Sequence, residues 1–78
     1  MDNNRKGKSD FRITLAAARV NAGYTQKEVA SIMHKTEQTI VNWERGRSDI
    51  DYANFVFLCN LYKAPVDAVF MPKLSTST

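Results

Sequence analysis

The 78-residue sequence predicts an all-α domain, a compact bundle of five short helices. No segment alternates apolar and polar residues between hairpin turns, so the pattern of a β-strand is poor. Residues that begin and end helices recur at short intervals instead. Each expected helix has about two to three turns and is marginal alone in water, so the helices need a shared core.

The first helix is expected to begin after Asp10, whose side chain suits an N-cap. We expect Gly23 to end it in the left-handed conformation that favours glycine. Residues 1–9 are predicted to be a flexible basic arm and residues 72–78 a disordered tail, which leaves a domain over 10–71. The apolar residues of the first helix are Ile13, Leu15, Ala16 and Val20.

A capping-box pattern begins the second expected helix, because Thr25 is followed by Glu28. This helix spans residues 26–33. We expect its buried side to consist of Val29, Ala30, Ile32 and Met33.

The third expected helix follows after very little chain. Thr36 suits its N-cap, it spans residues 37–45, and Gly46 ends it. So short a link forces a large crossing angle, and Ala30 supplies a small side chain where the two helices approach. The apolar residues expected on its inner face are Ile40 and Trp43.

The last two helices are expected over 52–62 and 65–70. Asp51 suits the N-cap of the first, which is the most apolar in the chain. Pro65 fixes the backbone at the start of the second, and Pro72 ends it.

Length and composition exclude several classes of protein. One small domain has no room for a catalytic scaffold, and no local motif places a nucleophile beside a base or forms a glycine-rich phosphate loop. One cysteine excludes an internal disulfide, and one cysteine with one histidine cannot form a four-ligand zinc site. No apolar run suggests a membrane span or a signal peptide. We therefore expect a cytoplasmic protein that is not an enzyme and has no cofactor, metal or small-molecule ligand.

The net charge of +3 is unevenly distributed. Residues 1–48 hold nine Lys/Arg and five Asp/Glu, a net of +4, whereas residues 49–78 hold two and three, a net of −1. A one-sided basic surface is typical of proteins that bind a phosphate backbone. An ordinary solvated surface explains the same charge, so charge alone leaves both interpretations open.

The start of the third expected helix has a polar face outside the core. Glutamine can bind adenine with two hydrogen bonds, glutamate accepts one from cytosine, and a threonine methyl group packs on the methyl group of thymine. The residues of this face are Thr36, Glu37, Gln38, Thr39 and Asn42, preceded by Lys35.

Two segments resemble the helix-turn-helix of the Cro/phage-repressor (XRE) family: G-Y-T-Q-K-E-V-A at 23–30 and T-E-Q-T-I-V-N-W-E-R-G at 36–46. The similarity extends over about residues 12–71, and the two segments at this spacing are specific to the family. The resemblance implies a lambda-repressor-like fold, with the helix-turn-helix at the second and third helices, and a protein that binds double-stranded DNA.

The resemblance also implies roles for single residues. Arg19 and Glu44 match a structural ion pair between the first and third helices. Contacts to bases in the major groove, or to its phosphate walls, are implied for Thr36, Glu37, Gln38 and Asn42, and we expect a base contact from Thr39 as well. Gln26 matches a position that contacts phosphate and also supports the recognition helix. Phosphate contacts are implied for Arg45, Arg47 and Ser48, and we expect them also from Lys27 and Lys35.

The sequence departs from the family pattern at four positions. His34 stands in the turn, where the family favours glycine, and Lys63 replaces another frequent glycine. Lys35 replaces a small or aliphatic residue, so it can point at a DNA phosphate instead. Ile50 replaces a frequent proline.

Several residues have alternative interpretations. Trp43 either packs in the core or stacks on a base, and Arg19 is either structural or a phosphate ligand. Glu37 either stabilises a helix N-terminus or contacts cytosine. Cys59 is either a core thiol or a redox sensor, and its apolar surroundings favour the core. His34 has no companion residues for a metal site.

The sequence therefore predicts a sequence-specific transcriptional regulator, most simply a repressor. The alternative is a protein-interaction module of the same fold, such as an antitoxin or anti-repressor. Because one small module contacts little DNA, we expect a homodimer on a palindromic operator. The aromatic residues that exceed the needs of the core, and that are candidates for the dimer contact, are Tyr52, Phe55, Phe57, Tyr62 and Phe70.

Overall fold

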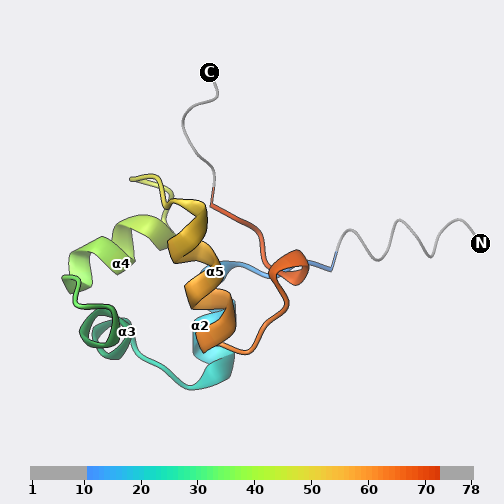
Figure 1. Ribbon diagram of the computed structural model, residues 1–78, viewed down its shortest axis with the longest axis horizontal. Helices are drawn as coiled ribbons and strands as arrows, with labels where there is room; N and C mark the ends of the chain where they lie inside the picture. Colours follow the sequence, from blue (N-terminus) through green and yellow to red (C-terminus); the bar gives the residue numbers. More distant parts are fainter. Residues whose placement is uncertain (1–10, 73–78) are drawn as a thin grey trace, which may run out of the picture.

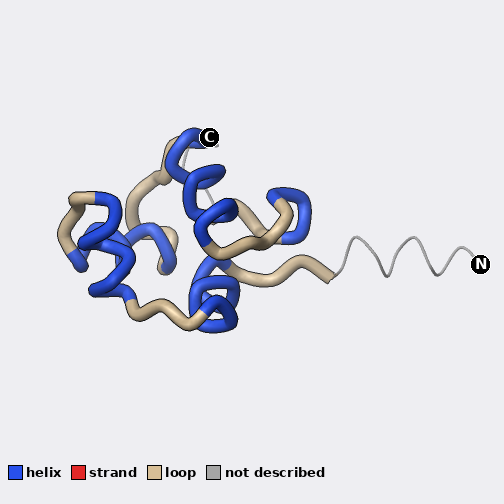
Figure 2. The backbone as a smooth tube through the Cα atoms, turned by 60° about the horizontal axis from the view of Figure 1, so that its bottom comes forward, coloured by secondary structure: helices blue, strands red, loops and turns tan. Residues whose placement is uncertain are grey.

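The computed structural model describes residues 11–72, which form helices and connecting loops (Figures 1 and 2). The α-helices are α2 (Leu15–Ala22), α3 (Gln26–Met33), α4 (Glu37–Glu44) and α5 (Tyr52–Leu61). Over this part of the chain the only β-type pairing is an isolated parallel bridge between Ile13 and Val69. The all-α class is confirmed. The count of five helices is not, because the expected last helix is a three-residue 3-10 turn, Val66–Ala68.

The first helix begins later than we predicted. Thr14 is the N-cap of α2, and its side-chain oxygen accepts a hydrogen bond from the backbone N–H of Ala17 at 3.0 Å. Asp10, the predicted cap, lies outside the described residues. The helix cannot start earlier because Ile13 is paired elsewhere: its N–H donates to the carbonyl of Ala68, and its carbonyl accepts from the N–H of Phe70, both at 2.9 Å.

The capping signals between α2 and α4 act as predicted. Gly23 ends α2 in the left-handed conformation, with φ 88°. The capping box is complete, since Thr25 accepts from the N–H of Glu28 at 3.0 Å and Glu28 accepts from the N–H of Thr25 at 2.9 Å. Thr36 is the N-cap of α4 and accepts from the N–H of Thr39 at 3.2 Å.

The start of α5 and the segment from residue 65 to 70 differ from the prediction. Asp51 occupies the N-cap position but makes no bond to a helix N–H. Its carboxylate accepts instead from the side-chain amide of Asn54 at 2.6 Å. After the turn that begins at Pro65, Val69 returns to an extended conformation because the chain there pairs with Ile13. The prediction of a helix through Phe70 is therefore wrong.

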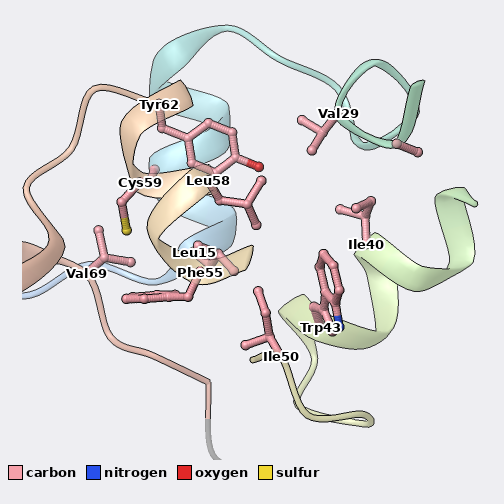
Figure 3. Close-up of a cluster of buried hydrophobic side chains, with 12 residues drawn as sticks. Leu15, Val29, Ile40, Trp43, Ile50, Phe55, Leu58, Cys59, Tyr62 and Val69 are labelled. Atoms are coloured by element: carbon pink, nitrogen blue, oxygen red, sulfur yellow. The ribbon is translucent and has the colours of Figure 1, made fainter. Parts of the chain in front are cut away.

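The core is a single cluster, to which all four helices contribute (Figure 3). In Figure 3, Val29, Ile40 and Trp43 extend from α3 and α4 toward the side chains of α2 and α5. Trp43 is 6% exposed, so it packs in the core. Ile32 was predicted to be buried but is 42% exposed, because it borders an open groove between α3 and α5. The buried residues are Leu15, Ala18, Val29, Ala30, Ile40, Trp43, Ile50, Phe55, Leu58, Cys59, Tyr62 and Val69.

Candidate nucleic-acid interface

The turn between α3 and α4 is tight and fully hydrogen-bonded. His34 ends α3 in the left-handed conformation, with φ 59°. Its N–H donates to the carbonyl of Ser31 at 3.2 Å, and the N–H of Lys35 donates to the carbonyl of Ala30 at 2.9 Å. Histidine thus adopts the conformation for which glycine is the usual residue. Ala30, near the end of α3, is buried, and its small side chain leaves room for α4 to approach.

One side of α4 is polar and open to solvent. We call it the α4 polar face; Thr36, Glu37 and Gln38 are exposed on it, and Thr39 and Asn42 are partly exposed. The opposite side of the helix is fixed in the core by Ile40 and Trp43. Because Ile40 and Trp43 lie in the core, the polar face of α4 is turned away from the core.

Four side chains of the α4 polar face are paired with each other. The hydroxyl groups of Thr36 and Thr39 lie 2.9 Å apart, and either can be the donor. One turn further along, the amide nitrogen of Gln38 donates to the amide oxygen of Asn42 at 3.0 Å. Sequence reasoning placed these residues together but missed both pairs. The spacing Gln-x-x-x-Asn is the pattern that could have revealed the second, since residues four apart meet on a helix.

Exposed basic residues come before and after the α4 polar face in the chain. Lys27 lies in the first turn of α3, Lys35 in the turn before α4, and Arg45 and Arg47 directly after α4. Ser48 is also exposed. These exposed positions lie on α3 and in the segments directly before and after α4, where an anion can reach them.

A buried hydrogen-bond network joins α2, α3 and α4. The Nε atom of Arg19 lies 2.7 Å from Oε2 of Glu44, and Nη2 of Arg19 lies 3.2 Å from Oε1. A third guanidinium donor binds the carbonyl of Tyr24 at 2.9 Å. The side chains of Arg19 and Glu44 are only 12% and 6% exposed. Arg19 is thus paired with Glu44 in the free protein, and this hydrogen bond raises the pKa of Arg19.

Gln26 belongs to the same network, and its partner in that network was not predicted from the sequence. Its Nε2 atom donates to Oε1 of Glu44 at 2.9 Å. The first residue of α3 is thereby tied to the last residue of α4. One amide hydrogen and the amide oxygen of Gln26 remain outside this bond.

The buried groups of α5 have no part in this surface. Burial raises the pKa of the Cys59 thiol, which is fully enclosed, so this cysteine is a core residue. Burial also raises the pKa of Tyr62, with a smaller contribution from the nearby carboxylate of Glu44. The Tyr62 hydroxyl is buried and has no hydrogen-bond partner among residues 11–72.

Comparison with known proteins agrees with this arrangement. A family model described as helix-turn-helix matches residues 15–69, from the start of α2 to the bridge residue Val69. The chain belongs to the XRE-type helix-turn-helix family. The match covers α3 and α4, the two helices joined by the tight turn, which form the helix-turn-helix of this chain. No helix within residues 11–72 is long and apolar enough to cross a membrane.

A curated relative of this XRE-type protein is the HTH-type transcriptional regulator ImmR of Bacillus subtilis (strain 168). The two sequences are 40% identical over 53 residues. The matched region is 68% of this chain and 42% of ImmR, so the chain spans less than half the length of that relative. No solved structure gave a significant match.

Proposed function

We propose that this protein is a sequence-specific regulator of transcription that binds double-stranded DNA, with α4 in the major groove. The α4 polar face carries this proposal: hydrogen-bonding side chains occupy one side of a helix whose other side is fixed in the core. The family and the relative named as a transcriptional regulator support it. The site needs no catalytic group, cofactor or metal.

Contacts divide into base reading and backbone binding. Base contacts are proposed for the α4 polar face: Thr36, Glu37, Gln38, Thr39 and Asn42. Phosphate contacts are proposed for Gln26, Lys27, Lys35, Arg45, Arg47 and Ser48. Gln26 suits this role because Glu44 holds its side chain while one amide hydrogen remains for a phosphate oxygen.

We propose that the protein binds a palindromic operator as a homodimer in the cytoplasm, and that it acts as a repressor by occupying the promoter. Of the surplus aromatic residues, Phe55 and Tyr62 are buried and are not available for a dimer contact. Tyr52 and Phe57 on α5 are 61% and 44% exposed. Phe57 also lines the groove of about 360 Å³ between α3 and α5, so α5 is the proposed contact.

Binding-site selection from random DNA duplexes tests the function. We expect one enriched sequence with two related half-sites about one helical turn apart. On that site Gln38→Ala should cost about 1–3 kcal/mol and relax the preference at one base pair. Asn21→Ala, an exposed change on α2, is the control and should leave binding unaltered.

Salt dependence separates this function from the alternative. Arg47→Ala should weaken binding to all sequences alike and reduce the slope of log K against log salt by about one. A protein-interaction module of the same fold would enrich no DNA sequence at all. Failure to enrich a sequence would therefore contradict the proposed function.

A further inference from the structure

The hydrogen bond between Gln38 and Asn42 restricts what Gln38 can recognise. Its amide nitrogen has two hydrogens, and only one can point at the amide oxygen of Asn42, 3.0 Å away. One N–H donor and the oxygen acceptor of Gln38 remain free. Adenine presents one acceptor and one donor in the major groove, whereas guanine presents two acceptors. The remaining atoms of Gln38 match adenine.

Asn42 is suited to hold Gln38 in this state. Gln38 is exposed on α4, whereas Asn42 is partly buried one turn later, next in sequence to the core residue Trp43. Asn42, the more buried side chain, is thus the acceptor, and Gln38, the more exposed one, is the donor. The bond also selects the amide orientation of Asn42, whose oxygen faces Gln38 while its nitrogen keeps both donors free.

We propose that Asn42 is a positioning residue for Gln38, and that the pair recognises adenine as one unit. This inference rests on the proposed function, since it concerns how α4 reads a base. It changes the role of Asn42 from an independent base contact to the residue that sets the preference of its neighbour. An exposed hydrogen bond between residues four apart on a helix shifts an equilibrium by up to about twofold, which is the size of the effect expected on base preference.

The test is a double-mutant cycle read out as base preference. Affinity is measured for the selected operator and for its variants with guanine, cytosine or thymine in place of the adenine that Gln38 contacts. The proteins are the wild type, Gln38→Ala, Asn42→Ala and the double variant, each with thermal unfolding measured alongside. Asn42→Asp is the matched variant, because its carboxylate still accepts a hydrogen bond from Gln38 but has no donor.

We expect Asn42→Ala to reduce the preference for adenine over guanine by up to about twofold at the Gln38 position. In the Gln38→Ala background the same change should leave this ratio unchanged, and the difference between the two backgrounds is the coupling that defines a shared unit. Asn42→Asp should bind all DNA more weakly, through charge repulsion, but retain the preference ratio. A purely structural role of Asn42 would move affinity and stability without moving this ratio.

Three results would overturn the inference. One is an unchanged adenine preference in Asn42→Ala, and another is an equal loss of preference with and without Gln38. The third is a selection without any sequence preference, which would refute the proposed function as well.

In the free protein, side-chain ¹⁵N relaxation of the Gln38 amide should show more motion in Asn42→Ala than in the wild type, and unchanged motion would count against the pair.

Discussion

Replacing Glu44 tests the network that holds the helix-turn-helix against α2. Glu44→Ala removes the acceptor for two bonds from Arg19 and one from Gln26. The guanidinium of Arg19 would keep its charge at a site where its side chain is only 12% exposed. Removing one partner of a buried ion pair costs about 3–5 kcal/mol, because the other charge is left without compensation.

That cost is large for a chain of this length. Small domains have a free energy of unfolding of about 0.05–0.15 kcal/mol per residue, which is roughly 4–12 kcal/mol for 78 residues. We expect urea denaturation of Glu44→Ala to show a greatly lowered midpoint, or unfolding already in buffer. Glu44→Gln keeps the shape and one acceptor, so it should lose about 1–3 kcal/mol.

The control is Glu37→Ala, at the other end of α4, where the side chain is exposed. It loses only a favourable interaction with the helix N-terminus, about 0.3–1 kcal/mol. Replacing both charges, in Arg19→Met with Glu44→Leu, should be much less harmful than Glu44→Ala, since no charge is left unpaired. If the free energy of unfolding of Glu44→Ala lies within about 1 kcal/mol of the wild-type value, as expected for the control, the energetic role assigned to this network is wrong.

Three further predictions concern α5 and the turn. Tyr62→Phe removes a buried hydroxyl without a partner, so it should raise the unfolding free energy by up to about 1 kcal/mol at neutral pH. Because burial raises the pKa of Tyr62, the unfolded state ionises first as pH rises above about 10, and the wild type should lose about 1.4 kcal/mol of unfolding free energy per pH unit there. Urea titrations from pH 8 to 11 should show a shallower loss of unfolding free energy for Tyr62→Phe. Equal dependence on pH in the two proteins would contradict the raised pKa. His34→Gly removes the strain of a side chain at positive φ and should stabilise the fold by about 0.5–1 kcal/mol, whereas Lys35→Gly, at negative φ, should destabilise it. Thermal unfolding that shifts the melting temperature in the same direction for both variants would contradict backbone strain at His34. Phe57→Ser should lower the dimer fraction in sedimentation equilibrium, unlike Val20→Ser on α2, and a dimer that survives Phe57→Ser would exclude the α5 contact.

Features that depend on neighbouring residues were predictable from the sequence. The capping box of Thr25 and Glu28, the N-cap at Thr36 and the left-handed Gly23 each involve side chains and backbone within one turn. The inner face of α4 followed from the spacing of Ile40 and Trp43. Local chemistry therefore fixed most helix boundaries to within a residue.

Features set by contacts across the fold were not predictable. Ile13 has an apolar side chain that fits a helix, and only its bonds to residues 68–70 keep it extended. Ile32 has suitable helical spacing for burial, but its exposure depends on how far α5 lies from α3. Within the candidate site, the polar character of α4 was evident, whereas the bond from Gln26 to Glu44 required the relative placement of two helices.

The bridge between Ile13 and Val69 also determines how this domain can be joined to other chains. It brings the first and last segments of the fold together, on the side opposite α3 and α4 in Figure 1. Residue 11 lies on that side (Figure 1), so a partner domain fused before it would start away from α3 and α4. The fold can therefore follow another domain in a longer chain and keep these two helices unobstructed.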